Sequence, residues 1–142
     1  MAKQKLLKLI PALHHATHSV SVFLDRHSAL GVTQAEAHIL THLWAEGEST
    51  VGQLHGAFGH RRSTLTSILD RLADRGLISR KSSETDRRTF IIALTTQGVK
   101  TARDAYKVLH ELESSVFRSI PRSGVEGFIA VAAAISRHGS SH

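Results

Sequence analysis

Two short amphipathic segments joined by a tight turn constrain the fold of this chain more than any other feature. The first covers residues 50–58 and opens with Thr50 and Gln53, which stand at the spacing of a capping box. The second covers residues 63–75, carries leucine and isoleucine along one side, and is followed by Gly76, a residue type that commonly ends a helix. The turn between the two segments reads GHRR. Two short helices joined in this way predict a helix-turn-helix.

A β-hairpin is predicted directly after the second of these helices. Residues 77–81 read as one strand. Residues 89–94 read as the other, because Phe90, Ile92 and Leu94 fall on one face and alternate with the side chains of the opposite face. The polar turn between the strands ends in DRR, so the hairpin would present two guanidinium groups at its tip.

Further helices are expected on both sides of this unit. The capping-box pair Thr33 and Glu36 opens a helix that Gly47 closes. The other helices are expected at residues 3–26, 96–119 and 125–137. The chain is therefore predicted to be mainly α with a small β-hairpin, and to form a single domain over residues 1–142. Because the terminal helices have apolar faces and no obvious partner within the chain, we expect a dimer built from the termini.

The distribution of charge favours an anionic partner. The formal net charge is +6, which favours nucleic acid or a membrane surface. Between His60 and Phe90 there are eight arginine and lysine residues and four acidic ones. The basic residues are Arg61, Arg62, Arg71, Arg75, Arg80, Lys81, Arg87 and Arg88. Membrane binding would need a strongly basic amphipathic helix, and since the basic cluster is centred on the hairpin instead, we expect no membrane contact.

The second helix of the pair carries the side chains expected to contact DNA. Its exposed face has short hydroxyl groups, which allow a helix to enter the major groove. These are Ser63, Thr64, Thr66 and Ser67. Arg61 and Arg62 precede the positive end of the helix, where phosphate binds, and Arg71 lies on the same exposed face. A hairpin behind such a helix can place an arginine in the minor groove, whose negative potential favours a guanidinium.

These segments together resemble a known family. The resemblance rests on TQAEAHILTHL, STLTSILDRLADRGLISR, the DRR turn and the closing LTTQG. They are similar to the winged helix-turn-helix regulators of the multiple-antibiotic-resistance (MarR) family. The resemblance implies a DNA-binding lobe at about residues 33–98 and dimerisation helices at about residues 1–30 and 99–142. It also implies a homodimeric repressor that binds double-stranded DNA at a pseudo-palindromic operator and is released by a small-molecule effector.

The resemblance further implies roles for the hairpin tip, which corresponds to the wing of the family. Asp86 and Arg88 match its D-x-R motif, with Arg88 as the minor-groove arginine. Asp86 is expected to support the tip by pairing with a nearby arginine, and Arg87, at the variable position, is expected to contact phosphate. The chain contains no cysteine, so the cysteine used by the oxidant-sensing branch of the family is absent and that mechanism is excluded.

Histidine offers candidates for an effector site. Eleven histidines are present, and His14 and His18 stand four residues apart on one expected helix, as His38 and His42 do on another. Such a pair shares one face of a helix and could bind Zn²⁺, Ni²⁺ or Cu²⁺. The resemblance implies an effector pocket near these segments. A small aromatic anion, a metal ion or haem could be the effector. The sequence identifies no cofactor.

Other classes of protein fit the sequence less well. No nucleophile elbow, P-loop, HExxH or GxGxxG motif is present, so we do not expect an enzyme. A winged helix used for protein contacts is the alternative outside DNA binding, and a steep salt dependence of affinity would separate the two. The longest strictly apolar run, residues 128–135, is too short to cross a bilayer, and we expect a cytoplasmic protein.

Overall fold

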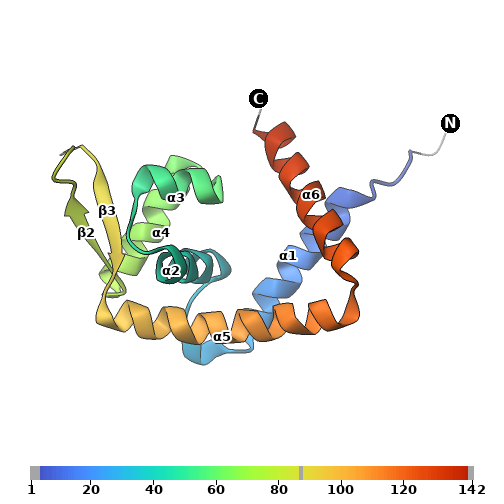
Figure 1. Ribbon diagram of the computed structural model, residues 1–142, viewed down its shortest axis with the longest axis horizontal. Helices are drawn as coiled ribbons and strands as arrows, with labels where there is room; N and C mark the ends of the chain where they lie inside the picture. Colours follow the sequence, from blue (N-terminus) through green and yellow to red (C-terminus); the bar gives the residue numbers. More distant parts are fainter. Residues whose placement is uncertain (1–3, 87, 141–142) are drawn as a thin grey trace. The chain divides into compact units, whose positions relative to one another are not determined.

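The computed structural model describes residues 4–86 and 88–140 (Figure 1). These divide into two compact units, one ending at Tyr106 and the other beginning at Lys107. In chain order the elements are α1 (Leu9–Asp25), a short 3₁₀ helix (Ser28–Leu30), α2 (Gln34–Glu46), β1 (Ser49–Thr50), α3 (Val51–Phe58), α4 (Arg62–Asp74), β2 (Ile78–Ser82), β3 (Phe90–Leu94), α5 (Thr96–Ser119) and α6 (Arg122–Gly139). The mainly α fold with a small sheet confirms the predicted fold class.

The predicted helix-turn-helix is present as α3 and α4. Thr50 caps α3, because its hydroxyl accepts a hydrogen bond from the Gln53 N–H (3.1 Å) while the Gln53 side chain accepts one from the Thr50 N–H (2.8 Å). Helix α4 begins at Arg62, one residue before the predicted start. Gly59 and Gly76 follow the two helices with φ of 66° and 72°, a left-handed backbone that a β-carbon would strain.

Helix α2 begins where the capping-box spacing predicts it, but the box forms only in part. The Thr33 hydroxyl accepts a hydrogen bond from the Glu36 N–H at 3.2 Å. The Glu36 carboxylate, expected to reach back to the cap, bonds instead to Arg71 and Arg75 of α4. That expectation was wrong because two guanidinium groups from a distant part of the chain offer the carboxylate stronger, charge-assisted hydrogen bonds.

The predicted hairpin belongs to a three-stranded antiparallel sheet with the order β1-β3-β2. Strands β2 and β3 pair from Ile78 opposite Leu94 to Ser82 opposite Phe90, which confirms the hairpin. Strand β1, which the sequence did not reveal, pairs with the other edge of β3. A two-residue strand shows no alternation that could be recognised in a sequence.

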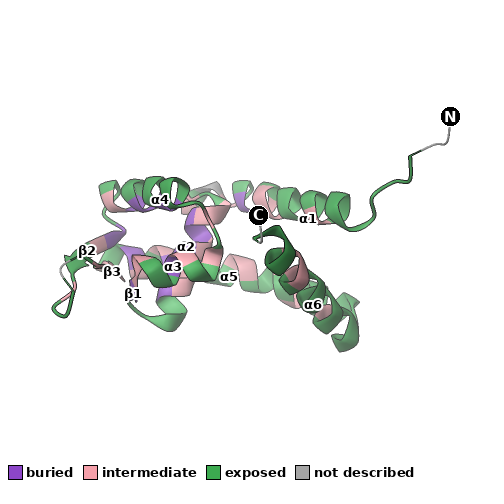
Figure 2. Cartoon of the chain, turned by 90° about the horizontal axis from the view of Figure 1, so that it is seen from above, coloured by how far each residue is buried: buried purple, intermediate pink, exposed green. Residues whose placement is uncertain are grey.

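The core of the first unit is formed mainly by α2, α3, α4 and the sheet, with Ala102 of α5 added, and the buried residues of Figure 2 are concentrated there. Its largest fully buried side chains are Ile39, Leu40, Leu54, Leu65, Leu72 and Ile92. Phe90 was predicted on the same strand face as Ile92, yet it is 48% exposed. It lies at the end of β3 next to the hairpin tip, beyond the reach of the core.

Helix α5 is joined tightly to the end of the hairpin. The Thr95 hydroxyl accepts a hydrogen bond from the Gly98 N–H (3.0 Å) and donates one to the Gly76 carbonyl (2.6 Å). The Thr95 N–H donates to the Leu77 carbonyl at 3.1 Å. Gly98 is buried so close to this carbonyl that an added β-carbon would lie 1.8 Å from the Leu77 oxygen. Glycine at this position therefore permits the close approach of α5 to the sheet.

Helix α1 is shorter than predicted. It begins at Leu9, and residues 4–8 are not helical; the expected start at Lys3 lies outside the described residues. Pro11 is the third residue of the helix, where its missing N–H removes no helical hydrogen bond. The proline therefore marks the start of α1.

In the second unit, α6 is longer than predicted. It begins at Arg122, directly after Pro121, and continues to Gly139. None of its described residues is buried, and Phe128 and Ile129 are 56% and 60% exposed. An apolar helical face is thus left uncovered by the unit itself. None of the helices in residues 4–86 and 88–140 combines the length and the apolar character needed to cross a membrane.

Candidate nucleic-acid interface

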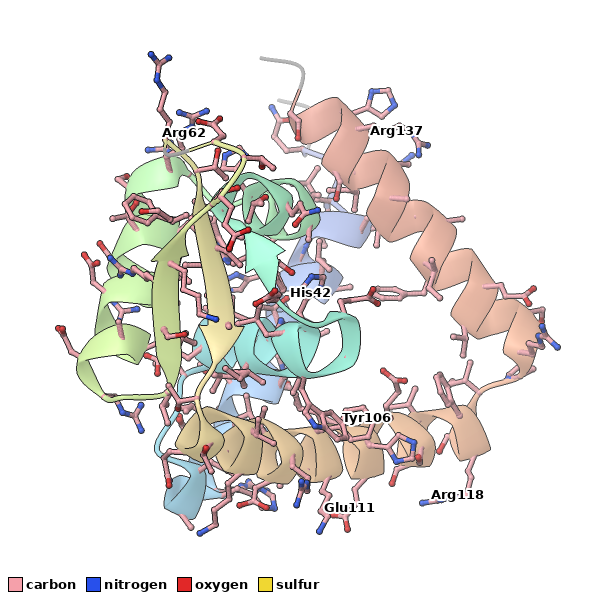
Figure 3. The ribbon with its side chains drawn as sticks, turned by 60° about the vertical axis from the view of Figure 1, so that its left-hand side comes forward. His42, Arg62, Tyr106, Glu111, Arg118 and Arg137 are labelled. Carbon is pink, nitrogen blue, oxygen red and sulfur yellow. The ribbon has the colours of Figure 1, made fainter. Side chains whose placement is uncertain are left out.

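The start of α4 presents basic and hydroxyl side chains to solvent. Arg61 is the N-cap and Arg62 the first helical residue; both are exposed, and the first turn contains no acid. Figure 3 labels Arg62 at this end of the helix. The Arg61 side chain does not cap the N–H groups of the first turn, so they are available to an anion. The predicted contact residues of this helix are all exposed: Ser63, Thr64, Thr66 and Ser67.

The hydroxyl groups on this face are not equivalent. The Thr66 hydroxyl donates a hydrogen bond to the Arg62 carbonyl oxygen at 2.8 Å. Among the described residues, none engages the hydroxyl groups of Ser63, Thr64 or Ser67. Three hydroxyl groups are therefore available for new hydrogen bonds, whereas the donor of Thr66 is already used.

An ion pair connects α4 to the hairpin. The Arg80 Nη2 atom of β2 donates to the Asp70 Oδ1 atom of α4 at 2.5 Å. The two side chains are 35% and 53% exposed, so the pair stabilises the protein by no more than about 1 kcal/mol. Its main effect is local, because it fixes the direction of Arg80 and neutralises an acid on the exposed face of α4. No local pattern of residues indicates this pairing.

A second set of ion pairs connects α4 to a buried carboxylate on α2. The Glu36 side chain is 5% exposed and accepts hydrogen bonds from Arg71 Nε (3.4 Å) and Arg75 Nη1 (3.1 Å). The arginine side chains remain 53% and 42% exposed. Arg71, predicted to contact DNA, thus has part of its guanidinium directed to Glu36. Glu36 itself was missed as a positioning residue because its local capping pattern already explained it.

The hairpin tip is organised by Asp86. Its carboxylate accepts a hydrogen bond from the Arg88 main-chain N–H (3.0 Å) and another from the Thr89 hydroxyl (3.2 Å). The Thr89 N–H donates to the Asp86 carbonyl at 3.0 Å. Asp86 therefore supports the tip through the main chain of Arg88, and no arginine side chain among the described residues pairs with its carboxylate. The Arg88 side chain is exposed, and Arg87 lies outside the described residues.

His42 of α2 lies beside an aromatic group of α3. The His42 ring meets the Phe58 ring edge-on with 5.2 Å between centroids, and Phe58 stacks on His60 at 6.4 Å; Figure 3 labels His42. His38, half-buried on the same helix, has its pKa lowered by burial and, to a smaller extent, by the positive charge of His60. The structure thus places three histidines near the turn that leads into α4.

Acidification is expected to destabilise the first unit through His38. Because folding lowers its pKa, the unfolded chain binds a proton at His38 more readily than the folded protein does. The free energy of unfolding should therefore fall as the pH drops below about 6.5, the ordinary histidine value, and level off below the folded pKa. His38→Gln should reduce this dependence, measured by urea unfolding on both sides of that pH.

The matched control for this prediction is His14→Gln, since His14 is exposed on α1. It should leave the pH dependence of the unfolding midpoint as it is in the wild type. The same pH dependence in wild type and His38→Gln would contradict the role of His38.

The four predicted effector histidines do not form a metal site with the side chains described. His14 and His18 are exposed on α1, whereas His38 and His42 are half-buried on α2. Within residues 4–86 and 88–140, no group of three or more histidine, aspartate or glutamate side chains could hold a metal ion. Each pair therefore has no third ligand in this part of the chain.

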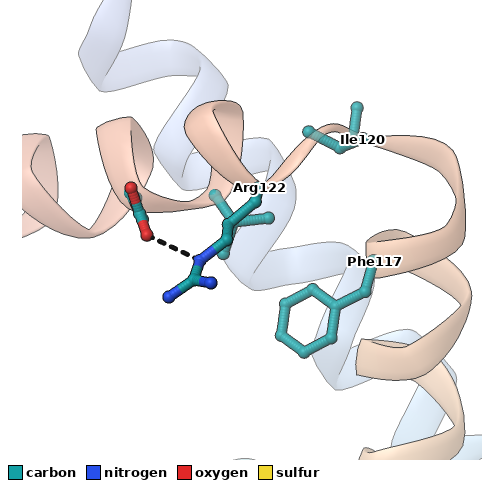
Figure 4. Close-up of a pocket in the computed structure, with 5 residues that line it drawn as sticks. Phe117, Ile120 and Arg122 are labelled. Atoms are coloured by element: carbon teal, nitrogen blue, oxygen red, sulfur yellow. Dashed lines mark hydrogen bonds and ion pairs between the residues drawn. The ribbon is translucent and has the colours of Figure 1, made fainter.

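A pocket of about 330 Å³ lies in the second unit (Figure 4). Its lining residues are Phe117, Ile120, Arg122, Val125 and Glu126. The Arg122 Nε atom donates to the Glu126 Oε1 atom at 2.9 Å. No predicted effector histidine lines this pocket. Its walls include the apolar side chains of Phe117 and Ile120, which are 50% and 44% exposed.

Comparison with known proteins agrees with this geometry. Residues 32–90 match the model of the MarR family, a range that includes α3, α4 and most of the hairpin. The organic hydroperoxide resistance transcriptional regulator of Bacillus subtilis (strain 168) is 36% identical over 98 residues, which are 69% of this chain and 65% of the relative.

Two solved structures have the same fold along nearly the whole chain. The S. aureus MepR–DNA complex has a TM-score of 0.79 at 21% identity, covering 92% of this chain and 97% of that one. NadR in complex with 4-hydroxyphenylacetate has a TM-score of 0.79 at 20% identity, covering 96% and 97%. At these identities the likeness establishes the fold alone. Over residues 32–90, the chain is therefore similar to the MarR family of transcriptional regulators.

Proposed function

We propose that this protein is a dimeric transcriptional repressor that binds duplex DNA sequence-specifically at a pseudo-palindromic operator. The observation that carries the proposal is the exposed hydroxyl face of α4, whose acid-free first turn is preceded by Arg61. Short hydroxyl groups suit base edges, while basic side chains and free N–H groups suit phosphate. The MepR relative was solved as a DNA complex, which supports this reading. The proposal includes no catalytic role.

We propose a specific DNA contact for each residue that the sequence predicted. The hydroxyl residues of α4 enter the major groove, and the arginines at its start bind phosphate. Arg88 enters the minor groove from a tip held by Asp86, and Arg87 contacts phosphate. Arg71 binds phosphate with the N–H groups that Glu36 leaves unused. The proposed DNA-contacting residues are Arg61, Arg62, Ser63, Thr64, Thr66, Ser67, Arg71, Arg87 and Arg88.

The dimer is proposed to form through residues of about 1–30 and 99–142, which flank a DNA-binding lobe at about 33–98. Large apolar side chains that are about half exposed support this assignment. They are Leu9 and Ile10 on α1, Phe117 on α5, and Phe128 and Ile129 on α6. Burying such side chains against a second copy would remove them from water. Two copies of α4 would then reach successive major grooves, about 34 Å apart.

The proposed effector is a small aromatic anion. NadR was solved with 4-hydroxyphenylacetate, which supports this class of ligand for the fold. Release would follow if the anion binds better to a dimer whose α4 helices no longer match the groove spacing. A metal ion or haem held by the histidine pairs is the alternative, and the described residues provide no third ligand that would favour it.

The test of this function is fluorescence anisotropy across a salt series. The protein is titrated against its own upstream DNA and against a scrambled duplex of the same composition. We expect preference for its own DNA, with log affinity falling by about 0.9 per log unit of salt for each phosphate neutralised. Addition of 4-hydroxyphenylacetate, Zn²⁺ or haem then identifies the effector class. No binding at low salt would contradict the proposal and favour a winged helix used for protein contacts.

Arg88→Ala is expected to weaken this binding without unfolding the protein. The side chain is exposed, and one arginine contact to DNA contributes about 1–3 kcal/mol. The affinity should therefore fall by roughly ten-fold or more at moderate salt. Anisotropy measures the affinity, and thermal unfolding checks the fold. Arg103→Ala, an exposed arginine on α5, is the charge-matched control and should bind like the wild type, provided that gel filtration shows it to be a dimer. If Arg88→Ala and Arg103→Ala bind DNA with equal affinity, the wing does not take part in the interface.

A further inference from the structure

We propose that Thr66 recognises the 5-methyl group of a thymine in each half of the operator. This inference rests on the proposed function, because it takes α4 as the helix that enters the major groove. Thr66 is exposed in the second turn of α4, and Ser63 and Ser67 lie on the same side of the helix. It therefore stands where a base edge would be contacted.

The Thr66 hydroxyl is already used within the helix. It donates to the Arg62 carbonyl oxygen at 2.8 Å, one turn earlier. A base acceptor such as guanine O6 could receive this proton only if that hydrogen bond were broken. The hydroxyl groups of Ser63 and Ser67 have no partner in the described chain, so they are better placed to hydrogen-bond with bases.

The same hydrogen bond decides which group Thr66 presents to the groove. Side-chain atoms occupy staggered positions, so the methyl group lies about 120° from the hydroxyl around the Cα–Cβ bond. With the hydroxyl turned back to Arg62, the methyl is the group of this exposed side chain that remains without a polar role. In the major groove, the 5-methyl group of thymine is the apolar partner that base edges offer.

The rotamer also provides a matched pair of substitutions. Valine in a helix strongly prefers one χ1 rotamer, and one of its two methyl groups then takes the place of the Thr66 methyl. Thr66→Val therefore keeps the methyl group and removes the hydroxyl, and Thr66→Ser does the reverse. If the methyl is recognised, the valine variant binds and the serine variant loses affinity; if the hydroxyl is recognised, the order is reversed.

The experiment begins with selection of a duplex from a random pool by the wild-type protein. Each thymine of the selected half-site is then replaced by deoxyuridine, which removes only the methyl group. The wild type should lose about four-fold in affinity per half-site at one thymine, as expected for one methyl group left in water. Thr66→Val should behave like the wild type on both duplexes. Thr66→Ser should bind the thymine duplex about four-fold more weakly per half-site, with no further loss on uracil.

Thr41→Ser on α2 is the control, because the Thr41 hydroxyl also donates to a carbonyl one turn earlier, that of Ala37 (2.9 Å). It should bind both duplexes like the wild type. Two results would overturn the role of Thr66 alone. In the first, replacing each thymine by deoxyuridine leaves the affinity of the wild type unchanged. In the second, Thr66→Val binds more weakly than Thr66→Ser. If the wild type selects no sequence, the proposed function fails and the Thr66 inference fails with it.

Discussion

Gly98→Ala is expected to destabilise the protein by about 3–5 kcal/mol, which is at the upper end for single substitutions. An added β-carbon would lie 1.8 Å from the Leu77 carbonyl oxygen and 2.9 Å from its carbon. This carbonyl cannot move aside freely, because it accepts the Thr95 N–H at 3.1 Å where the hairpin meets α5. The clash must therefore separate α5 from β2. The measurement is the free energy of unfolding from urea titration followed by circular dichroism.

Gly56→Ala is the matched control for this prediction. Gly56 lies inside α3, and beyond its chain neighbours and the backbone of its own helix no atom lies within 4 Å of an added β-carbon. Since alanine is the better helix former, the free energy of unfolding should rise slightly, by up to about 1 kcal/mol. If Gly98→Ala and Gly56→Ala both unfold at the same denaturant concentration as the wild type, the close approach of α5 to the sheet is contradicted.

The second large effect is expected when the arginines that pair with Glu36 are removed. In Arg71→Ala/Arg75→Ala, a carboxylate that is 5% exposed loses the two guanidinium groups that bond to it. A buried charge left without partners costs about 3 kcal/mol or more. In Glu36→Gln, by contrast, the two arginines remain half-exposed and are hydrated by water, so the expected loss is about 1 kcal/mol. Chemical unfolding of the two variants measures this asymmetry.

A triple variant separates the buried charge from simple loss of packing. Adding Glu36→Gln to the double arginine variant removes the unpaired charge and should restore part of the lost stability. Arg122→Ala, which removes an arginine from the exposed pair with Glu126, should leave the free energy of unfolding nearly unchanged. A triple variant no more stable than the double variant would show that the Glu36 charge is not the cause.

Local signals predicted the helices well where the determining contacts are local. Thr50 and Gln53 form the complete capping box that their spacing predicts. Thr33 and Glu36 have the same spacing, yet only the threonine side of the box forms, because arginines far along the chain bind the glutamate. Sequence spacing could not distinguish the two cases, since the deciding residues lie more than thirty positions away.

The residue types of the candidate interface could be predicted from the sequence, but the ion pairs and hydrogen bonds between them could not. The hydroxyl face and the basic start of α4 follow from helical spacing, because each position depends on the helix alone. The pair between Asp70 and Arg80 depends on how the sheet packs on α4. The bond from Thr66 to Arg62 depends on a rotamer. Neither the packing nor the rotamer has a signature in the order of residues.

The two-residue strand β1 affects how the protein folds. By pairing with β3, it closes a loop of chain that contains α3, α4 and β2. Closing such a loop costs entropy before its contacts form, so we expect this ladder to form late in folding. Once it is closed, β3 is bonded on both edges, and the amide protons at its centre exchange with water mainly through global opening. The helix-turn-helix and the wing therefore gain and lose their structure as one cooperative unit.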